Sequence, residues 1–262
     1  MAQPKLLLVT DTYHPKVDGT VRFIEEFCAR ATPFFDTTIL APQFIKSLKS
    51  TDKIKLLPVS KLLKPLPNYP IIKLSLPNIR TIKSEVQKSD IIFIQGPALL
   101  SLLALHYARK YRKLSVAYFH VLPWELYEKS ASNPFRKIIA KIVHKICSTE
   151  YNHANLLLYP YSDLSATMIA QGFIAPHKVA RLGVDINRFY PAINNSMYKK
   201  KIGIDPNQFV IGYVGRISPE KNVKTLVRAV HKMGPDNHLI LIGDGNSEQK
   251  KIAEKFPNCT IT

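Results

Sequence analysis

The sequence has few cysteines and no long apolar run. Cys28, Cys147 and Cys259 are odd in number, lie far apart and form no C-x-x-C pair, which argues against a disulfide framework and a zinc site. The longest nearly apolar stretch, residues 98–108, is interrupted by two polar residues and is well short of the ~20 residues that a membrane-spanning helix needs. The amino-terminal apolar run, 6–9, is too short for a secretion signal. These absences indicate a protein of the reducing cytosol.

Acidic residues are also scarce. The 262 residues include 37 Lys and Arg against 19 Asp and Glu, a net charge of +18. Such an excess suits nucleic acid, an anionic membrane surface or phosphate-bearing small molecules. Most of it lies in residues 46–88, with a net +8, and in residues 109–145, with a net +7. The 46% hydrophobic content and the length predict one large or two modest folded domains and exclude a disordered chain.

Short apolar runs alternate with helical periodicity along the chain. Residues 5–10, 90–94 and 115–119 are typical of buried parallel strands, and residues 98–110 are typical of a helix between two of them. Because parallel strands need crossover connections, this alternation predicts an α/β chain with a parallel sheet and helices on both faces. The Pro- and Lys-rich passage from Pro65 to Pro77 is expected to be irregular surface.

A second alternation begins at residue 209, after a stretch without periodicity at 191–201 that we interpret as a linker. Strands are expected at 209–214, 239–242 and from 259 to the end, with helices at 220–233 and 247–256. This unit stops at its third strand, and an unpaired strand edge favours aggregation. We therefore expect the front part of a longer protein, with domains at 1–185 and 186–262.

The strongest local signal for a binding site lies at the turn after the strand expected at 209–214. Ser218 is predicted to cap the following helix and Lys221 to lie in its first turn. Free amides and the helix dipole attract an anion there, Arg216 and Lys221 add two charges, and Gly215 permits close approach. An Arg fork and a Lys point charge together suit a diphosphate. The alternative is an ordinary turn with solvated charges.

Weaker candidates lie at other strand ends. His120 follows a predicted strand, where an imidazole can hydrogen-bond a substrate hydroxyl, although a lone histidine is as often structural. Gly19 can let a ligand approach the first helix, and Gly243 and Gly245 can admit a base or ribose near the backbone, although each is also a common turn residue. The first loop lacks G-x-G-x-x-G and the chain lacks a P-loop motif, so hydride transfer and P-loop hydrolysis lose support.

Residues 134–147 have a basic amphipathic pattern. Phe135 and the isoleucines share one side of a helical wheel, and the lysines share the other. A basic amphipathic helix can lie in a membrane interface. The commoner alternative is a helix that packs its apolar side on the core.

Taken together, these segments resemble retaining nucleotide-sugar glycosyltransferases of the GT-B fold, in glycosyltransferase family 4. The resemblance runs over the whole chain and depends on the order and spacing of five segments. They are L-L-V-T-D-T-Y-H-P-x-x-D-G ending at Gly19, Y-F-H ending at His120, G-V-D-x-x-x-F-x-P from Gly183, G-x-x-G-R-x-x-x-x-K-N ending at Asn222, and I-G-D-G ending at Gly245.

The resemblance implies an α/β, GT-B-like fold of two Rossmann-like domains with parallel sheets that face each other across a cleft, the second being incomplete. The first domain would bind the acceptor and the second the nucleotide diphosphate sugar. Catalytic roles are expected for His120, near the transferred sugar, and for Arg216 and Lys221, which would stabilise the leaving diphosphate. Donor contacts are expected from Gly19, Gly215, Arg216, Lys221, Gly243 and Gly245. Acceptor contacts are expected from Asp18, His120 and Glu125.

Two departures from the family pattern bear on activity. Asp18-Gly19 replaces the Gly-Gly of many members, which leaves the acceptor open. The E-x7-E motif would lie beyond Thr262, so this chain alone is expected to have weak activity or none.

The resemblance and the charge also bear on partners. The family is generally metal-independent, so we expect no metal and no cofactor beside the sugar donor. The basic first domain indicates a lipid or glycan acceptor and a cytoplasmic protein at the inner face of an anionic membrane. A non-catalytic phosphate-binding α/β module remains the first alternative. A nucleic-acid-binding protein is the second, and nucleic acid is not expected because charge is its only support.

Overall fold

The computed structural model describes residues 2–60, 71–120, 122, 124, 134–191, 196–218, 221–245, 247, 251 and 254–262. The chain divides into two compact units, Met1–Gly183 and Val184–Thr262. The acceptor and donor roles expected for domains 1–185 and 186–262 stay predictions.

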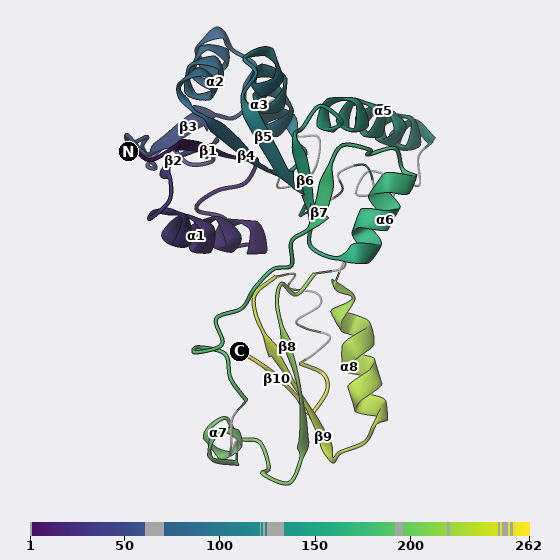
Figure 1. The fold of residues 1–262 in the computed structure, drawn as a ribbon. Coiled ribbons are helices and arrows are strands. Elements are labelled where there is room, and N and C mark those ends of the chain that lie inside the picture. Colours follow the sequence, from purple (N-terminus) through teal and green to yellow (C-terminus); the bar gives the residue numbers. More distant parts are fainter. Residues whose placement is uncertain are drawn as a thin grey trace. The chain divides into compact units, whose positions relative to one another are not determined.

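The first unit is a parallel α/β structure (Figure 1). Its strands and helices are β1 (Lys5–Thr10), α1 (Gly19–Ala31), β2 (Asp36–Gln43), β3 (Ile54–Pro58), α2 (Leu76–Lys88), β4 (Ile91–Gln95), α3 (Leu99–Lys110), β5 (Leu114–Tyr118), α5 (Pro134–Tyr151), β6 (Leu156–Tyr159), α6 (Ser162–Ala170) and β7 (His177–Val179). The strands pair in the order β3-β2-β1-β4-β5-β6-β7, and every neighbouring pair is parallel. The parallel sheet expected from the alternation is confirmed.

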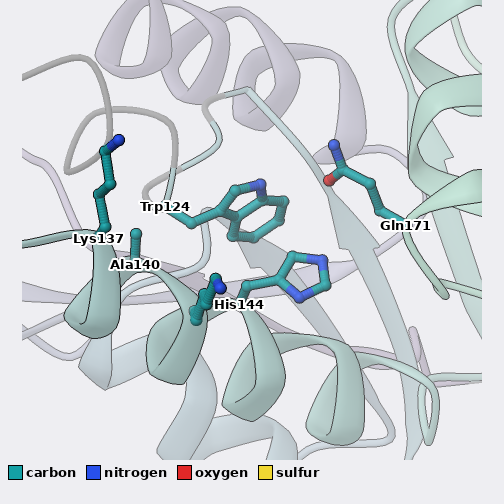
Figure 2. A pocket seen from close by; sticks show the side chains of 6 residues that line it. Trp124, Lys137, Ala140, His144 and Gln171 are labelled. Carbon is teal, nitrogen blue, oxygen red and sulfur yellow. The ribbon is translucent and has the colours of Figure 1, made fainter. Parts of the chain in front are cut away.

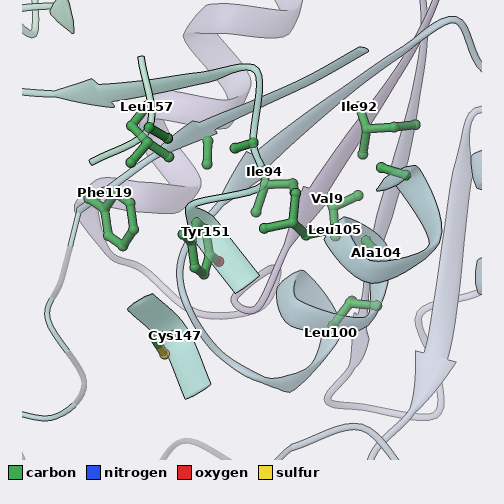
Figure 3. Close-up of a cluster of buried hydrophobic side chains, with 14 of the residues drawn as sticks. Val9, Ile92, Ile94, Leu100, Ala104, Leu105, Phe119, Cys147, Tyr151 and Leu157 are labelled. Carbon is green, nitrogen blue, oxygen red and sulfur yellow. The ribbon is translucent and has the colours of Figure 1, made fainter. Parts of the chain in front are cut away.

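Each face of this sheet is covered by its own hydrophobic core. Side chains alternate along a strand, so Leu6 and Leu8 of β1 pack with Ile24 of α1, while Leu7 and Val9 face the opposite core. That opposite core is built from α2, α3, α5 and α6, and part of it is shown in Figure 3. Burial on both faces explains why β1 is an uninterrupted apolar run.

Helix α2 corrects the expectation of irregular structure up to Pro77. This proline lies in the first turn of the helix, where its fixed φ fits and its missing N–H would have no partner within the helix. Further along, Ile82 and Val86 are fully buried against the sheet. The sequence did not predict the start of this helix, because its apolar spacing begins only after Pro77. Residues 61–70 lie outside the described part of the chain.

The second unit contains a smaller parallel sheet. Its elements are α7 (Ser196–Lys201), β8 (Phe209–Val214), α8 (Val223–Lys232), β9 (Asn237–Ile242) and β10 (Cys259–Ile261). The strands pair in the order β10-β9-β8, and Val223, Val227 and Val230 of α8 pack on Leu239 and Leu241 of β9. Helix α7 corrects the interpretation of 191–201 as linker throughout. Of the helix expected at 247–256, residues 248–250, 252 and 253 lie outside the described residues, and residues 254–256 are not helical.

Candidate functional site

The carboxyl edge of the first sheet has a point where the connections diverge. From β1 the chain continues through α1 to β2 on one side, and from β4 it continues through α3 to β5 on the other. Ligands of open α/β sheets bind at such a point. The loop after β1 and the end of β4 are therefore the natural place for a site in this unit.

Asp11 fixes the start of the loop after β1. Its carboxylate accepts hydrogen bonds from the backbone N–H groups of Ala98, at 3.0 Å, and Leu100, at 3.1 Å, and from the hydroxyl of Ser101. Burial raises the pKa of Asp11 above its usual value, and these hydrogen bonds offset only part of that rise. Asp11 thereby joins this loop to the start of α3. The sequence contained it within the first motif, but nothing in the spacing indicated that it anchors a distant helix.

Asp18 and Gly19 lie where this loop enters α1. The Asp18 carboxylate caps the helix, accepting from the N–H of Val21 at 3.0 Å and from the hydroxyl of Thr12 at 3.1 Å. Gly19 begins the helix, and a Cβ placed on it would meet no atom within 4 Å. Asp18 thus has a structural task, and its contact with an acceptor stays a prediction. The open space at Gly19 leaves room for a ligand beside the helix N-terminus.

His120 lies beyond the end of β5 and contacts the end of β4. Its Nε2 is 2.6 Å from Oε1 of the buried Gln95, and its ring packs on Phe23 and Tyr118 with centroids 5.0 and 4.6 Å away. Burial lowers the pKa of His120 to about 4, and the charge of Asp18 opposes this shift only weakly. At neutral pH the imidazole is therefore uncharged and can exchange hydrogen bonds with a hydroxyl. The third expected acceptor residue, Glu125, lies outside the described residues.

We expect His120 to titrate near pH 4 and to make the fold less stable in acid. Between pH 6.5 and about 4 the unfolded chain binds a proton that folded His120 does not, so stability present at neutral pH is lost as the pH falls through this window. The loss is about 3 kcal/mol. NMR titration of the imidazole C–H signals measures the pKa. Urea unfolding at several pH values, compared with His120→Gln, isolates the contribution to stability. A midpoint near 6.5, or parallel pH profiles for the two proteins, would contradict this expectation.

In the second unit the loops after β8 and β9 are paired through their backbones. The N–H of Gly215 donates to the carbonyl oxygen of Ile242 and the N–H of Ile217 to that of Asp244, both at 2.9 Å. Ile217 and Gly245 form a parallel bridge beyond the named strands. The pairing of β8 with β9 thus continues into the loop that carries Arg216.

Gly243 and Gly245 make this pairing sterically possible. A Cβ on Gly243 would lie 2.0 Å from the carbonyl oxygen of Gly215, and a Cβ on Gly245 would lie 2.0 Å from that of Ile217. Their φ angles of 147° and 157° also disfavour any other residue. Glycine is therefore required at both positions, because any side chain would clash with the backbone of the β8 loop. The nucleotide contacts expected of them stay predictions.

Arg216 is held by hydrogen bonds on both sides while its side chain is exposed. The Tyr213 hydroxyl donates to the Arg216 carbonyl oxygen at 2.8 Å, and the adjacent residues Gly215 and Ile217 bond to the β9 loop. Its guanidinium thus projects from a fixed backbone at the carboxyl edge of β8. The sequence assigned no role to Tyr213, because alternation along a strand does not predict which group its hydroxyl contacts.

The structure corrects the expected start of the helix after this loop. Helix α8 begins at Val223 with Asn222 as its N-cap residue, so Lys221 precedes the first turn, and its N–H donates to the carbonyl oxygen of Ser218 at 3.0 Å. The buried Ser218 hydroxyl has no hydrogen-bond partner among the described residues. Asn222 has φ 51°, a conformation that Asn adopts more readily than most residues. A single left-handed residue here separates the lysine from the helix.

Helix α5 exposes isoleucines to solvent, unlike a helix whose whole apolar side packs on the core. Its buried side carries Ala140, Cys147 and Tyr151. Ile138, Ile142 and Ile146 are 57%, 53% and 48% exposed. Lys137, Lys141 and Lys145 stand directly beside them and are also exposed. No described helix is long and apolar enough to cross a membrane.

The comparisons with known proteins concern both units. Residues 194–256 match the family described as Glycosyl transferases group 1. This matched segment is similar to a Glycosyl transferases group 1 domain. That match includes the β8 and β9 loops, with Gly215, Arg216, Lys221, Gly243 and Gly245. The loops whose backbones pair are thus part of the matched segment.

Curated relatives extend the similarity beyond this matched segment. A GDP-mannose-dependent alpha-mannosyltransferase of Mycobacterium tuberculosis is 26% identical over 202 residues, which is 75% of this chain and 50% of the relative. A UDP-Gal:alpha-D-GlcNAc-diphosphoundecaprenol alpha-1,3-galactosyltransferase of Escherichia coli is 35% identical over 85 residues, 29% of this chain and 22% of the relative. The chain spans about half or less of the length of these relatives.

A solved structure supports the fold of the whole chain. Anabaena HepE in complex with UDP superposes with a TM-score of 0.70 at 17% identity, covering 98% of this chain and 68% of that one. The expected GT-B-like α/β fold, with its seven-stranded parallel sheet and second, smaller parallel sheet, is confirmed. Asp18 and His120 lie in the loops at the strand ends of the first unit, and Gly19 begins the helix after β1. Gly215, Arg216, Lys221, Gly243 and Gly245 lie in the loops after β8 and β9 of the second unit.

Proposed function

We propose that the protein transfers a sugar from a nucleotide diphosphate sugar to an acceptor, with retention of anomeric configuration. The observation that carries this proposal is the turn after β8, whose backbone pairs with the β9 loop and which carries Arg216, with Lys221 shortly after it in sequence. This turn lies within the segment that matches Glycosyl transferases group 1. Retention is supported by the family resemblance.

Arg216 and Lys221 supply the donor chemistry in this proposal. As the bond between sugar and diphosphate breaks, negative charge grows on the leaving oxygen, and cations placed there stabilise the transition state more than the ground state. Because their two charges offset that of the diphosphate, the proposal includes neither a metal nor a cofactor. Gly215 and the β9 glycines keep the neighbouring backbone close and free of side chains.

The acceptor is proposed to bind to the first unit, beside His120. Its uncharged imidazole can accept a proton from, or orient, an attacking hydroxyl, and Asp18 lies near enough to raise its pKa slightly. The Escherichia coli relative is named for a diphosphoundecaprenol-linked acceptor. This name and the exposed isoleucines of α5 support a lipid or lipid-linked glycan, reached from the inner face of an anionic membrane.

A panel of nucleotide sugars and simple polyanions tests the donor class. Thermal stabilisation of the 262-residue chain by a UDP- or GDP-sugar, larger than that by pyrophosphate or heparin at equal charge, is the expected result. Equal stabilisation by all polyanions would favour the non-catalytic phosphate-binding module. Preference for DNA or RNA would favour the nucleic-acid reading. For the full-length protein, labelled transfer and NMR of the product's anomeric proton test activity and retention, and an inverted product would contradict retention.

We expect Ile142→Ser to weaken binding to anionic membranes about tenfold without lowering the thermal midpoint. The side chain is 53% exposed, so the fold loses little, whereas burial of an isoleucine in a lipid interface stabilises binding by roughly 1.5–3 kcal/mol. Flotation with phosphatidylglycerol vesicles measures the membrane affinity of the variant. Ile45→Ser, at a side chain 42% exposed in the loop after β2, is the matched control. Equal flotation with neutral vesicles, or none with either, would count against the membrane proposal.

A further inference from the structure

A pocket of about 280 Å³ lies on the α5 side of the first sheet (Figure 2). It is lined by Trp124, Lys137, Ala140, Lys141, His144 and Gln171. His120 packs in the core on the α1 face with Phe23 and Tyr118, whereas Trp124 belongs to the core of the opposite face. The pocket therefore lies on the opposite face of the sheet from the core that His120 contacts.

Three buried polar atoms in this pocket have no hydrogen-bond partner among the described residues. They are Nε1 of Trp124, Nε2 of His144 and Oε1 of Gln171, and none has a partner within the part of the chain that the structure describes. Trp124 is only 4% exposed, so its N–H is shielded from bulk water. Native proteins rarely leave such atoms unsatisfied, and three in one pocket indicate a polar ligand.

Aromatic packing holds the Trp124 and His144 rings in place. The Trp124 ring stacks on Phe173 with centroids 5.4 Å apart and planes 21° apart. The His144 ring meets Trp124 edge-on at 5.1 Å and Phe173 at 5.7 Å. A tryptophan and a histidine locked in this way present the indole N–H and the imidazole Nε2 in fixed directions, as a specific site requires.

Charge and size define the ligand. Lys137 and Lys141 lie one helical turn apart on α5, and no carboxylate is among the described residues that line the pocket. Two ammonium groups and an indole N–H suit an anionic oxygen. The acceptor Oε1 of Gln171 requires a donor, such as a hydroxyl. Because a water molecule takes about 30 Å³, the volume fits a group several times larger than water, with carbons beyond a phosphate.

We infer that this pocket binds the phosphate ester of a small polyol, with Lys137, Lys141 and Trp124 on the phosphate and Gln171 on a hydroxyl. The same chemistry occurs in a phospholipid headgroup and in a free polyol phosphate. Binding does not depend on sugar transfer, so it can be measured without a donor.

Trp124 is the single tryptophan of the chain, so its fluorescence reports directly on the pocket. The 262-residue chain is titrated with glycerol 3-phosphate, with short-chain phosphatidylglycerol below its micellar concentration, and with glycerol and inorganic phosphate. We expect a saturable change with at least one of the first two, at least tenfold tighter than with phosphate alone, and none with glycerol. A response to glycerol 3-phosphate assigns a free polyol phosphate, and a response to the lipid alone assigns a headgroup.

Lys141→Gln and Gln171→Leu are each expected to weaken this binding about tenfold, with unchanged thermal midpoints. Lys145→Gln is the matched control, since Lys145 is exposed on the same helix and does not line the pocket. Trp124→Phe, followed by calorimetry, keeps a ring against Phe173 but removes the N–H, and a tenfold loss is again expected. No response to either phosphate ester, or equal losses in Lys141→Gln and Lys145→Gln, would overturn the inference.

Discussion

Gly243→Ala is expected to destabilise the second unit by about 4 kcal/mol. The new Cβ would lie 2.0 Å from the carbonyl oxygen of Gly215, so the β8 and β9 loops must separate and lose the paired hydrogen bonds on either side of Arg216. Strain at a φ of 147° adds roughly 1–3 kcal/mol, and overpacking adds a similar amount. A small domain is stable by about 5–15 kcal/mol, so the loss is a large share of the total.

Hydrogen exchange of peptides covering residues 209–217 measures this effect, because β8 and its loop should open sooner in the variant. Trp124 lies in the first unit, so its fluorescence should show an unchanged urea midpoint there. Gly212→Ala is the matched control, since a Cβ at Gly212 meets nothing within 4 Å and its φ is not positive. Protection in Gly243→Ala equal to that in Gly212→Ala would show that the loops are not held by this contact.

Arg216→Ala is expected to lower kcat/KM for sugar transfer by the full-length protein by about 10²–10³-fold. The lost guanidinium is proposed to stabilise charge that develops on the leaving diphosphate, and removal of one such donor costs about 2.7–4 kcal/mol in other enzymes. Because the side chain is exposed and its backbone is held by Tyr213 and the β9 loop, the fold should be retained. Arg216→Lys should recover only part of the rate, since the bidentate fork is lost.

Steady-state transfer kinetics, together with UDP- and GDP-sugar affinity of the 262-residue chain, measure the effect of Arg216→Ala. Arg228→Ala provides the control, because Arg228 is exposed on α8, beyond the loop, and has no proposed role. A rate within a few fold of the unaltered protein, or an equal loss in Arg228→Ala, would remove Arg216 from the chemistry.

Much of the fold was predictable from local pattern. The run Lys5–Thr10 is apolar because a strand inside a parallel sheet is buried on both faces, and its bounds agree with those expected. Phe209–Val214 also has its expected bounds, although none of its residues is fully buried. Errors arose where a local signal had two meanings. Pro77 is compatible with a loop and with the first turn of a helix, and the isoleucines of α5 fit a core face as well as an exposed one.

The candidate site was predictable as a set of motifs but not as an arrangement. The sequence placed Arg216 and His120 at strand ends, where side chains of α/β proteins meet ligands. It could not show that Gln95, 25 residues earlier, faces His120, or that the β9 loop holds the turn at Arg216. These contacts join segments that are far apart along the chain, and no sequence periodicity predicts which distant segments meet.

By itself the sequence determined that this is a basic, parallel α/β chain with cations at a strand-to-helix turn, because apolar periodicity and net charge are local properties. Only the tertiary structure decided why Gly243 and Gly245 are glycines, and which side of α5 faces solvent. It also decided that Trp124, His144 and Gln171 bring to one pocket polar atoms that have no partner among the described residues. Each of these depends on the distance between atoms far apart in the chain, and that distance is set when the elements pack.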